Sequence, residues 1–149
     1  MSPAGWAERL RRALPGLWLG LLLTLALVVA PSLFALLERP LAGRVAGRLF
    51  AIEAPLGLAL CVLLGLLERR RAAQRALAGQ GTGASVELLL VLGALFCTVL
   101  GHYALQPMLD AARAGEGRWS FAALHGAATA CFGLKTLLVA GLTWRAARP

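Results

Sequence analysis

Hydrophobic residues along the chain fall into four long runs, separated by short stretches that carry most of the charges. The runs cover about residues 13–37, 50–67, 85–105 and 121–143, and each is close to the ~20 residues that an α-helix needs to cross ~30 Å of hydrocarbon. The stretches between them are too short to form a soluble domain. The pattern therefore predicts an all-α protein, with a single membrane domain over residues 1–149 that forms an integral four-helix bundle.

Two prolines bear on where the predicted helices bend or end. The first run follows basic residues, as in a signal peptide, but it is longer than the ~7–15 apolar residues of a cleavable one. We therefore expect a retained helix that is kinked at Pro31, because proline lacks the N–H that would bind the Leu27 carbonyl. Pro107 is expected to end the third helix.

The composition supports a membrane protein and argues against nucleic-acid binding. Hydrophobic residues make up 59% of the 149 residues and the mean hydropathy is +0.74, whereas soluble domains are about 45–50% apolar. The net charge of +8 comes from arginines at the ends of the apolar runs, where they can bind phospholipid headgroups. Because no basic stripe is interleaved with aromatic residues, we expect the lipid bilayer as the partner and no nucleic acid.

The arginines also predict the orientation of the chain in a bacterial inner membrane. Nine of them lie in the two terminal tails and in the stretch between the second and third runs, and five lie on the other side. The positive-inside rule therefore places both termini in the cytoplasm. Trp18, Trp119 and Trp144 lie near the ends of runs, as expected for an interfacial aromatic belt.

Small residues recur at every fourth position of the second and third runs. The two stripes are Gly57, Cys61 and Gly65, and Gly93, Cys97 and Gly101. Such stripes let helix backbones approach closely; we expect packing within one bundle, and a homo-oligomer or contact with another membrane protein is the alternative. The three cysteines, Cys61, Cys97 and Cys131, are expected to pack as small apolar residues, with a copper-binding thiolate site as the alternative.

Five ionisable residues lie inside the predicted spans, where each is costly to bury and is therefore a candidate for function. They are Glu53, Glu87, His102, His125 and Lys135. At ~1.5 Å of rise per residue, the two histidines and Glu53 each lie about 5 Å below the outer boundary. One hypothesis is a metal, haem or proton-handling site at this level. The alternative is that each residue reaches a headgroup or a neighbouring carbonyl.

Lys135 is the most deeply placed of these residues, near the middle of the fourth run. Its ammonium must either face the bundle interior or extend toward water. We predict that Lys135 pairs with Glu87 on the adjacent third helix, because both residues lie on the cytoplasmic half. Contact with a ligand anion is the alternative.

Several segments resemble the transmembrane protein 205-like family of small bacterial four-helix membrane proteins, a domain of unknown function. These segments are "LWLGLLLTLALVVAPSLFALL" followed by "LAGRVAGRLF", and later "YALQPMLDAAR" and "FAALHG". The resemblance implies four helices and no established activity. More distantly, the chain is similar to copper-resistance D-type proteins and to haem-binding protoporphyrinogen oxidases, which hold haem with a span-one histidine and a span-four lysine. Here Lys135 is present and the histidine is not, which argues against haem ligation.

Catalytic motifs are absent from the sequence. There is no CxxC or GxGxxG pattern, and "GQGTG" is not followed by GK[ST]. We therefore expect an inner-membrane protein with a structural or accessory role, without enzymatic activity and without a cofactor. The alternatives are a transporter of small solutes or ions, or a membrane protein that binds a metal or haem. For copper or haem, the candidate ligands are His102, His125, Cys61, Cys97 and Cys131.

Overall fold

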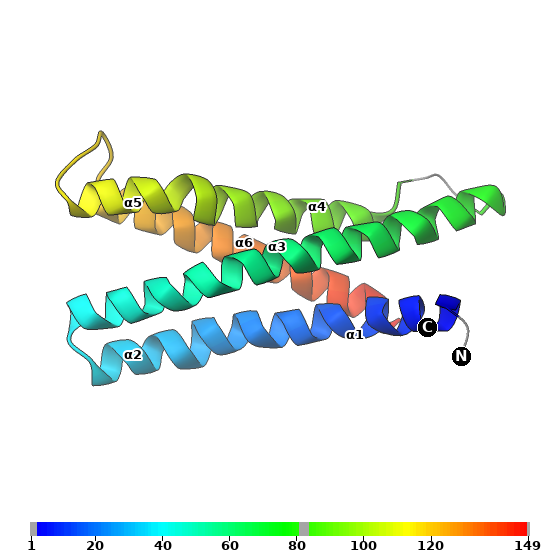
Figure 1. Ribbon diagram of the computed structural model, residues 1–149, viewed down its shortest axis with the longest axis horizontal. Helices are drawn as coiled ribbons and strands as arrows, with labels where there is room; N and C mark the ends of the chain where they lie inside the picture. Colours follow the sequence, from blue (N-terminus) through cyan, green and yellow to red (C-terminus); the bar gives the residue numbers. More distant parts are fainter. Residues whose placement is uncertain (1–2, 81–83, 149) are drawn as a thin grey trace.

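Four long helices run up, down, up and down in the computed structural model, which describes residues 3–80 and 84–148 (Figure 1). Both termini and the connection between the second and third helices lie at one end, called here the terminal end. The other two connections lie at the opposite, distal end. The elements are α1 (Pro3–Thr24), η1 (Leu25–Val29) and α2 (Ala30–Leu36) in the first helix, α3 (Arg39–Leu77) in the second, α4 (Val86–Thr98), η2 (Val99–Ala104) and α5 (Leu105–Arg113) in the third, and α6 (Phe121–Ala147) in the fourth.

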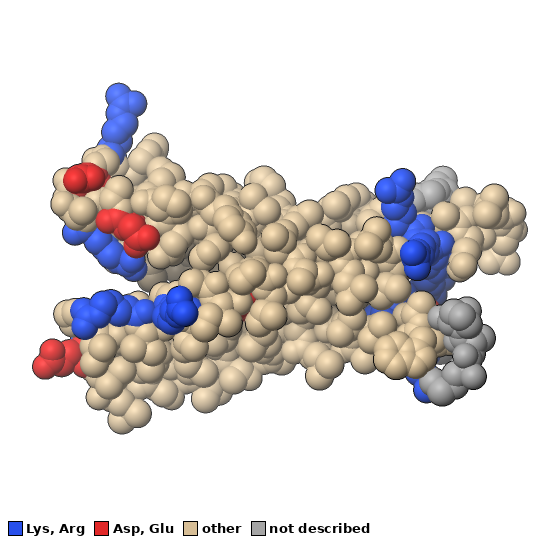
Figure 2. Space-filling model, viewed as in Figure 1, with Lys and Arg blue, Asp and Glu red and all other residues tan. Residues whose placement is uncertain are grey.

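The surface of the bundle suits a bilayer. Each of the four helices within the described residues is long and apolar enough to cross a membrane. On the face shown in Figure 2, charged side chains gather at the two ends and a broad uncharged band lies between them. Large apolar side chains such as Leu17, Phe96 and Leu137 point outward, where lipid would cover them. The predicted all-α fold, a four-helix bundle of membrane-spanning length, is confirmed.

The helices extend beyond the apolar runs that predict them. α3 is 39 residues long and begins at Arg39, well before the expected start near residue 50. Serines begin the last two helices, as the preference for hydroxyl N-caps implies. The side chain of Ser85 accepts the N–H of Leu88, and that of Ser120 accepts the N–H of Ala123.

Pro31 and Pro107 each follow a π-helical turn. η1 ends at Val29, two residues before Pro31, where the sequence predicts a kink, and η2 ends at Ala104, three residues before Pro107. In η2 the N–H of Leu105 binds the carbonyl of Leu100, five residues back. This wider turn gives backbone groups near the proline new partners. The third helix therefore continues through Pro107 to Arg113, so the prediction that Pro107 ends it is wrong.

The main hydrophobic core lies in the terminal half of the bundle. Its central residues come from α1, α3, α4 and α6: Trp18, Leu22, Cys61, Leu64, Val91, Ala94, Val139 and Leu142. The expectation that Trp18 belongs to an interfacial belt is wrong, because its indole turns inward and is only 1% exposed. Trp119 and Trp144 are 62% and 65% exposed, respectively.

Gly57 lets α1 approach α3 at the edge of this core. A Cβ at Gly57 would lie 3.0 Å from Oε1 of Glu53 and 3.4 Å from Cζ2 of Trp18. A Cβ at Gly93 would meet only the flexible end of Leu138, at 3.0 Å, and a Cβ at Gly20 would have nothing within 4 Å.

We predict that Gly57→Leu lowers the melting temperature in detergent by several degrees, because the added side chain displaces the Trp18 indole at a cost of about 1–3 kcal/mol. Gly93→Leu should lower it less, since the Leu138 side chain can rotate away. Gly20→Leu is the matched control and should melt like the wild type. Equal melting temperatures for Gly57→Leu and Gly20→Leu would show that the indole does not pack there.

Candidate functional site

A cavity of about 830 Å³ occupies the distal half of the bundle, beyond the packed core. We call it the distal groove; it is lined by residues from η1, α2, α3, α4, η2, α5 and α6. Small residues leave this space open. Gly43 and Gly47 line the groove on α3, and a Cβ at either would meet no atom within 4 Å. At the distal end the groove therefore lies between the α2–α3 pair and the α5–α6 pair, while α2 packs against α3 and α5 packs against α6.

A buried ion pair forms the floor of the distal groove. Nζ of Lys135 donates to Oε2 of Glu53 at 2.7 Å, and the two side chains are only 5% and 4% exposed. Nε1 of Trp18 donates to the other oxygen of Glu53 at 3.4 Å. Nζ of Lys135 also lies 5.0 Å from the centre of the Phe132 ring, a cation–π distance. Residues of α1, α3 and α6 thus meet at one point.

The level of this pair follows from where the two helices begin. Both α3 and α6 run from the distal end toward the terminal end (Figure 1). Glu53 is the fifteenth residue of α3 and Lys135 is the fifteenth of α6, so both lie about 21 Å from their helix starts at ~1.5 Å per residue. Just above them, Phe50 and Phe132 meet edge to face with ring centroids 5.2 Å apart.

Glu87 forms an ion pair with Arg145, so the predicted pair between Lys135 and Glu87 is wrong. Nε of Arg145 donates to Oε1 of Glu87 at 3.0 Å, near the terminal end. The physical reason is the start of the second helix: its apolar run begins near residue 50, which would place Glu53 near the outer boundary. Because α3 begins at Arg39, Glu53 lies instead at the level of Lys135.

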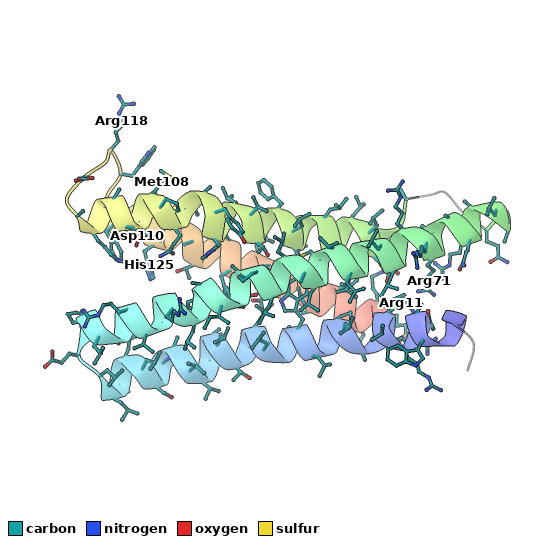
Figure 3. The ribbon with its side chains drawn as sticks, viewed as in Figure 1. Arg11, Arg71, Met108, Asp110, Arg118 and His125 are labelled. Carbon is teal, nitrogen blue, oxygen red and sulfur yellow. The ribbon has the colours of Figure 1, made fainter. Side chains whose placement is uncertain are left out.

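A second group of ion pairs ties the terminal end together. Nη1 of Arg11 lies 3.3 Å from Oε1 of Glu68, which joins α1 to α3, and both residues are buried. Nη2 of Arg11 donates to Oε1 of Glu8 at 2.7 Å. Figure 3 shows Arg11 and Arg71 between α1 and α3. Sequence reasoning missed Glu68, because it lies just outside the apolar run and beside four arginines that dominate the local charge.

The two histidines line the distal groove, and their ring contacts are with aromatic neighbours. His125 stacks on Phe121 with ring centroids 5.6 Å apart, and Figure 3 shows it in the space between α5 and α3. Along α6, His125 lies about 15 Å from Lys135, toward the distal end. His102 lies in η2 and meets Tyr103 edge to face at 5.0 Å. Glu53 is therefore deeper than His125. Residues 3–80 and 84–148 contain no group of three His, Cys, Asp or Glu side chains placed to hold a metal.

The cysteines are free thiols with different surroundings. Cys61 is buried in the terminal core, and Cys97 is buried beside the groove. Cys131 is half-buried, and its Cβ lies 3.6 Å from where a Cβ at Gly101 would stand.

The mouth of the distal groove is basic. Arg39, Arg44 and Arg113 line it, and basic side chains are visible on both sides of the opening in Figure 2. Nη1 of Arg113 donates to Oδ1 of Asp110 at 2.7 Å, and its guanidinium lies 5.2 Å from the centre of the Phe121 ring. Within the described part of the chain, Arg39 and Arg44 have no carboxylate within ion-pair distance.

A family model described as "Domain of unknown function (DUF4149)" matches residues 13–118. The chain belongs to the DUF4149 family. No curated protein and no solved structure matches the chain significantly. The match to DUF4149 includes Trp18, Glu53 and His102, whereas His125 and Lys135 lie on α6, outside the matched region.

We predict that Lys135 and Glu53 are energetically coupled. Lys135→Met and Glu53→Gln should each lower the melting temperature in detergent, because either change leaves a buried charge without its partner, at a typical cost of about 3–5 kcal/mol. The double variant should recover part of the loss in a double-mutant cycle.

Glu87→Gln provides the matched control for this cycle. Its effect should add to that of Lys135→Met without coupling, because Glu87 pairs with Arg145. Coupling of Lys135 to Glu87, together with strict additivity for Lys135 and Glu53, would contradict the observed pairing.

Proposed function

We propose that this DUF4149 protein is a non-enzymatic accessory protein of the bacterial inner membrane that binds an apolar or amphipathic molecule in the distal groove. The observation that carries the proposal is the cavity of about 830 Å³ in the distal half of the bundle. Small-molecule sites are mostly apolar clefts of about 300–1,000 Å³ with a few polar groups at defined positions. The distal groove has this character, with phenylalanines and small residues in its walls and one ion pair at its floor.

Binding is favoured over transport because the groove ends blindly. Below Glu53 and Lys135, the side chains of Trp18, Leu22 and Leu64 fill the terminal half of the bundle and are at most 1% exposed. A polar path across the membrane would have to pass through this core. The arrangement therefore supports a molecule that enters and leaves by the same opening.

Catalysis and haem ligation receive less support from the ionisable groups. The carboxylate of Glu53 and the ammonium of Lys135 neutralise each other, whereas a general acid or base needs a group that can exchange a proton with a substrate. The distant resemblance to haem-binding oxidases would make Lys135 the span-four lysine at the haem. Here it is engaged with Glu53, and η1, α1 and α2 contain no histidine.

We also infer that both termini lie in the cytoplasm, so the distal groove opens toward the periplasm. The small-residue stripes serve packing within one chain, since the spaces next to Gly65 and Gly101 are filled by Val91 and Cys131. The family relationship extends to the transmembrane protein 205-like proteins, on the strength of the segments quoted above.

A groove-filling variant tests the binding function. Gly47→Leu adds a side chain to the open groove at a position where a Cβ meets no atom within 4 Å, and the matched control Gly20→Leu adds one to an exposed position outside the groove. We expect native mass spectrometry of wild-type protein purified in detergent to show a bound apolar or amphipathic molecule. Gly20→Leu should retain this adduct and Gly47→Leu should lose most of it. Equal adducts in both variants would contradict binding in the groove.

The orientation is tested with reporter fusions. A fusion at the C-terminus should be active with a cytoplasmic-type reporter, and an insertion at Gly117, in the exposed turn before α6, should be active with a periplasmic-type reporter. Periplasmic-type activity at the C-terminus would overturn the proposed orientation.

A further inference from the structure

We propose that the ligand of the distal groove is an amphipathic anion, a single hydrocarbon chain with a phosphate or carboxylate head. The inference rests on the groove-binding function proposed above and adds the chemistry and the direction of the ligand. The chain lies along the groove with its end at the Glu53–Lys135 floor. The head lies at the mouth, against Arg39, Arg44 and Arg113.

The sign of the charge on the ligand head follows from the charged side chains that line the groove. Four cationic side chains line it, together with one carboxylate, Glu53. The charges of Glu53 and Lys135 cancel at the floor, so the remaining positive charge of the groove comes from the three arginines at the mouth. Asp110 forms an ion pair with Arg113 and offsets the charge of that arginine alone. Guanidinium groups bind phosphate and carboxylate with paired, charge-assisted hydrogen bonds, so Arg39 and Arg44 favour an anionic head.

The direction of the ligand follows from the floor. The floor has no net charge, and each polar side-chain atom of its ion pair already has a hydrogen-bond partner. An anionic head placed at the floor would face the carboxylate of Glu53. The arginines at the mouth would then have no anion to bind. The aromatic rings of Phe50 and Phe132, directly above the floor, provide an apolar contact for the end of a hydrocarbon chain.

The length of the groove suits one chain. From Arg39 to Glu53, α3 rises about 21 Å at ~1.5 Å per residue, and α6 rises equally from Phe121 to Lys135. Half of a ~30 Å hydrocarbon core is about 15 Å, which is the depth that one lipid chain covers in its leaflet. A chain of lipid length therefore fits between the mouth and the floor.

Trp18 provides a probe of the floor, because its indole contacts Glu53 there. In full-length protein with Trp6, Trp119 and Trp144 replaced by phenylalanine, we would titrate a long-chain alkyl phosphate that carries bromine near the end of its chain. We expect saturable quenching of Trp18 fluorescence. The same compound brominated next to the head should quench less, because its bromine stays at the mouth. Stronger quenching by the head-brominated compound would overturn the proposed direction.

Matched ligands and variants test the head. A tail-brominated alkyl trimethylammonium compound and a neutral alkyl glycoside of equal length should bind at least about tenfold more weakly than the phosphate. The double variant Arg39→Gln, Arg44→Gln should weaken phosphate binding by at least about tenfold and leave the neutral compound unchanged. Arg118→Gln is the control, because Arg118 points away from the groove (Figure 3) and does not line it.

The outcomes separate the two proposals. Equal binding of all three compounds, unaffected by the arginine changes but lost in Gly47→Leu, would refute an anionic ligand and retain the groove-binding function. Absence of saturable quenching by any compound would refute both. Competition by unbrominated lysophosphatidylglycerol, which has one acyl chain, would identify a membrane lipid as the source of the anion. Competition by a fatty acid or alkyl phosphate alone would identify a free single-chain anion.

Discussion

The ion pair between Glu53 and Lys135 constrains the rest of the structure. A charged side chain in the hydrocarbon region is costly unless it is paired, and only a close partner of opposite sign removes most of that cost. The chain has a single lysine, and it lies in the middle of α6. Its partner must therefore reach the same level from another helix, and the start of α3 at Arg39 brings Glu53 to that level. The pair contributes mainly to the register of α3 against α6, since buried pairs add little net stability over apolar residues of similar size.

This register divides the bundle into two halves with different properties. In the terminal half, Trp18 and the aliphatic core are tightly packed, and Arg11 and Arg145 join neighbouring helices through Glu68 and Glu87. In the distal half, glycines and alanines leave the groove open, and two π-helical turns lie in the helices beside it. The packed core and the proposed binding site therefore lie in separate regions. A change in the groove walls is expected to alter ligand binding without unfolding the terminal core.

The number and order of the helices could be predicted from the sequence, because each helix contains an apolar run of membrane length. Their ends could not, since arginines inside helical turns look the same in sequence as arginines in loops. Because of this ambiguity, neither the start of α3 nor the partner of Lys135 could be predicted. The burial of Trp18 could not be predicted for a related reason. A tryptophan near the end of an apolar run can lie either at the membrane interface or in the core. Glu53, His102, His125 and Lys135 were all singled out from the sequence, and all four line the groove, but which of them touch depends on helix register.

A zero-length cross-link tests the central pairing most directly. A membrane-permeant carbodiimide activates a buried carboxyl group, and an amine in contact with it displaces the urea and forms an amide. Because Lys135 is the only lysine, an internal lysine cross-link identifies its neighbour without ambiguity. Peptide mass spectrometry of the protein treated in native membranes should find Lys135 joined to Glu53. Lys135 joined to Glu87, or Glu53 carrying the unreacted carbodiimide adduct beside an unmodified Lys135, would contradict the account.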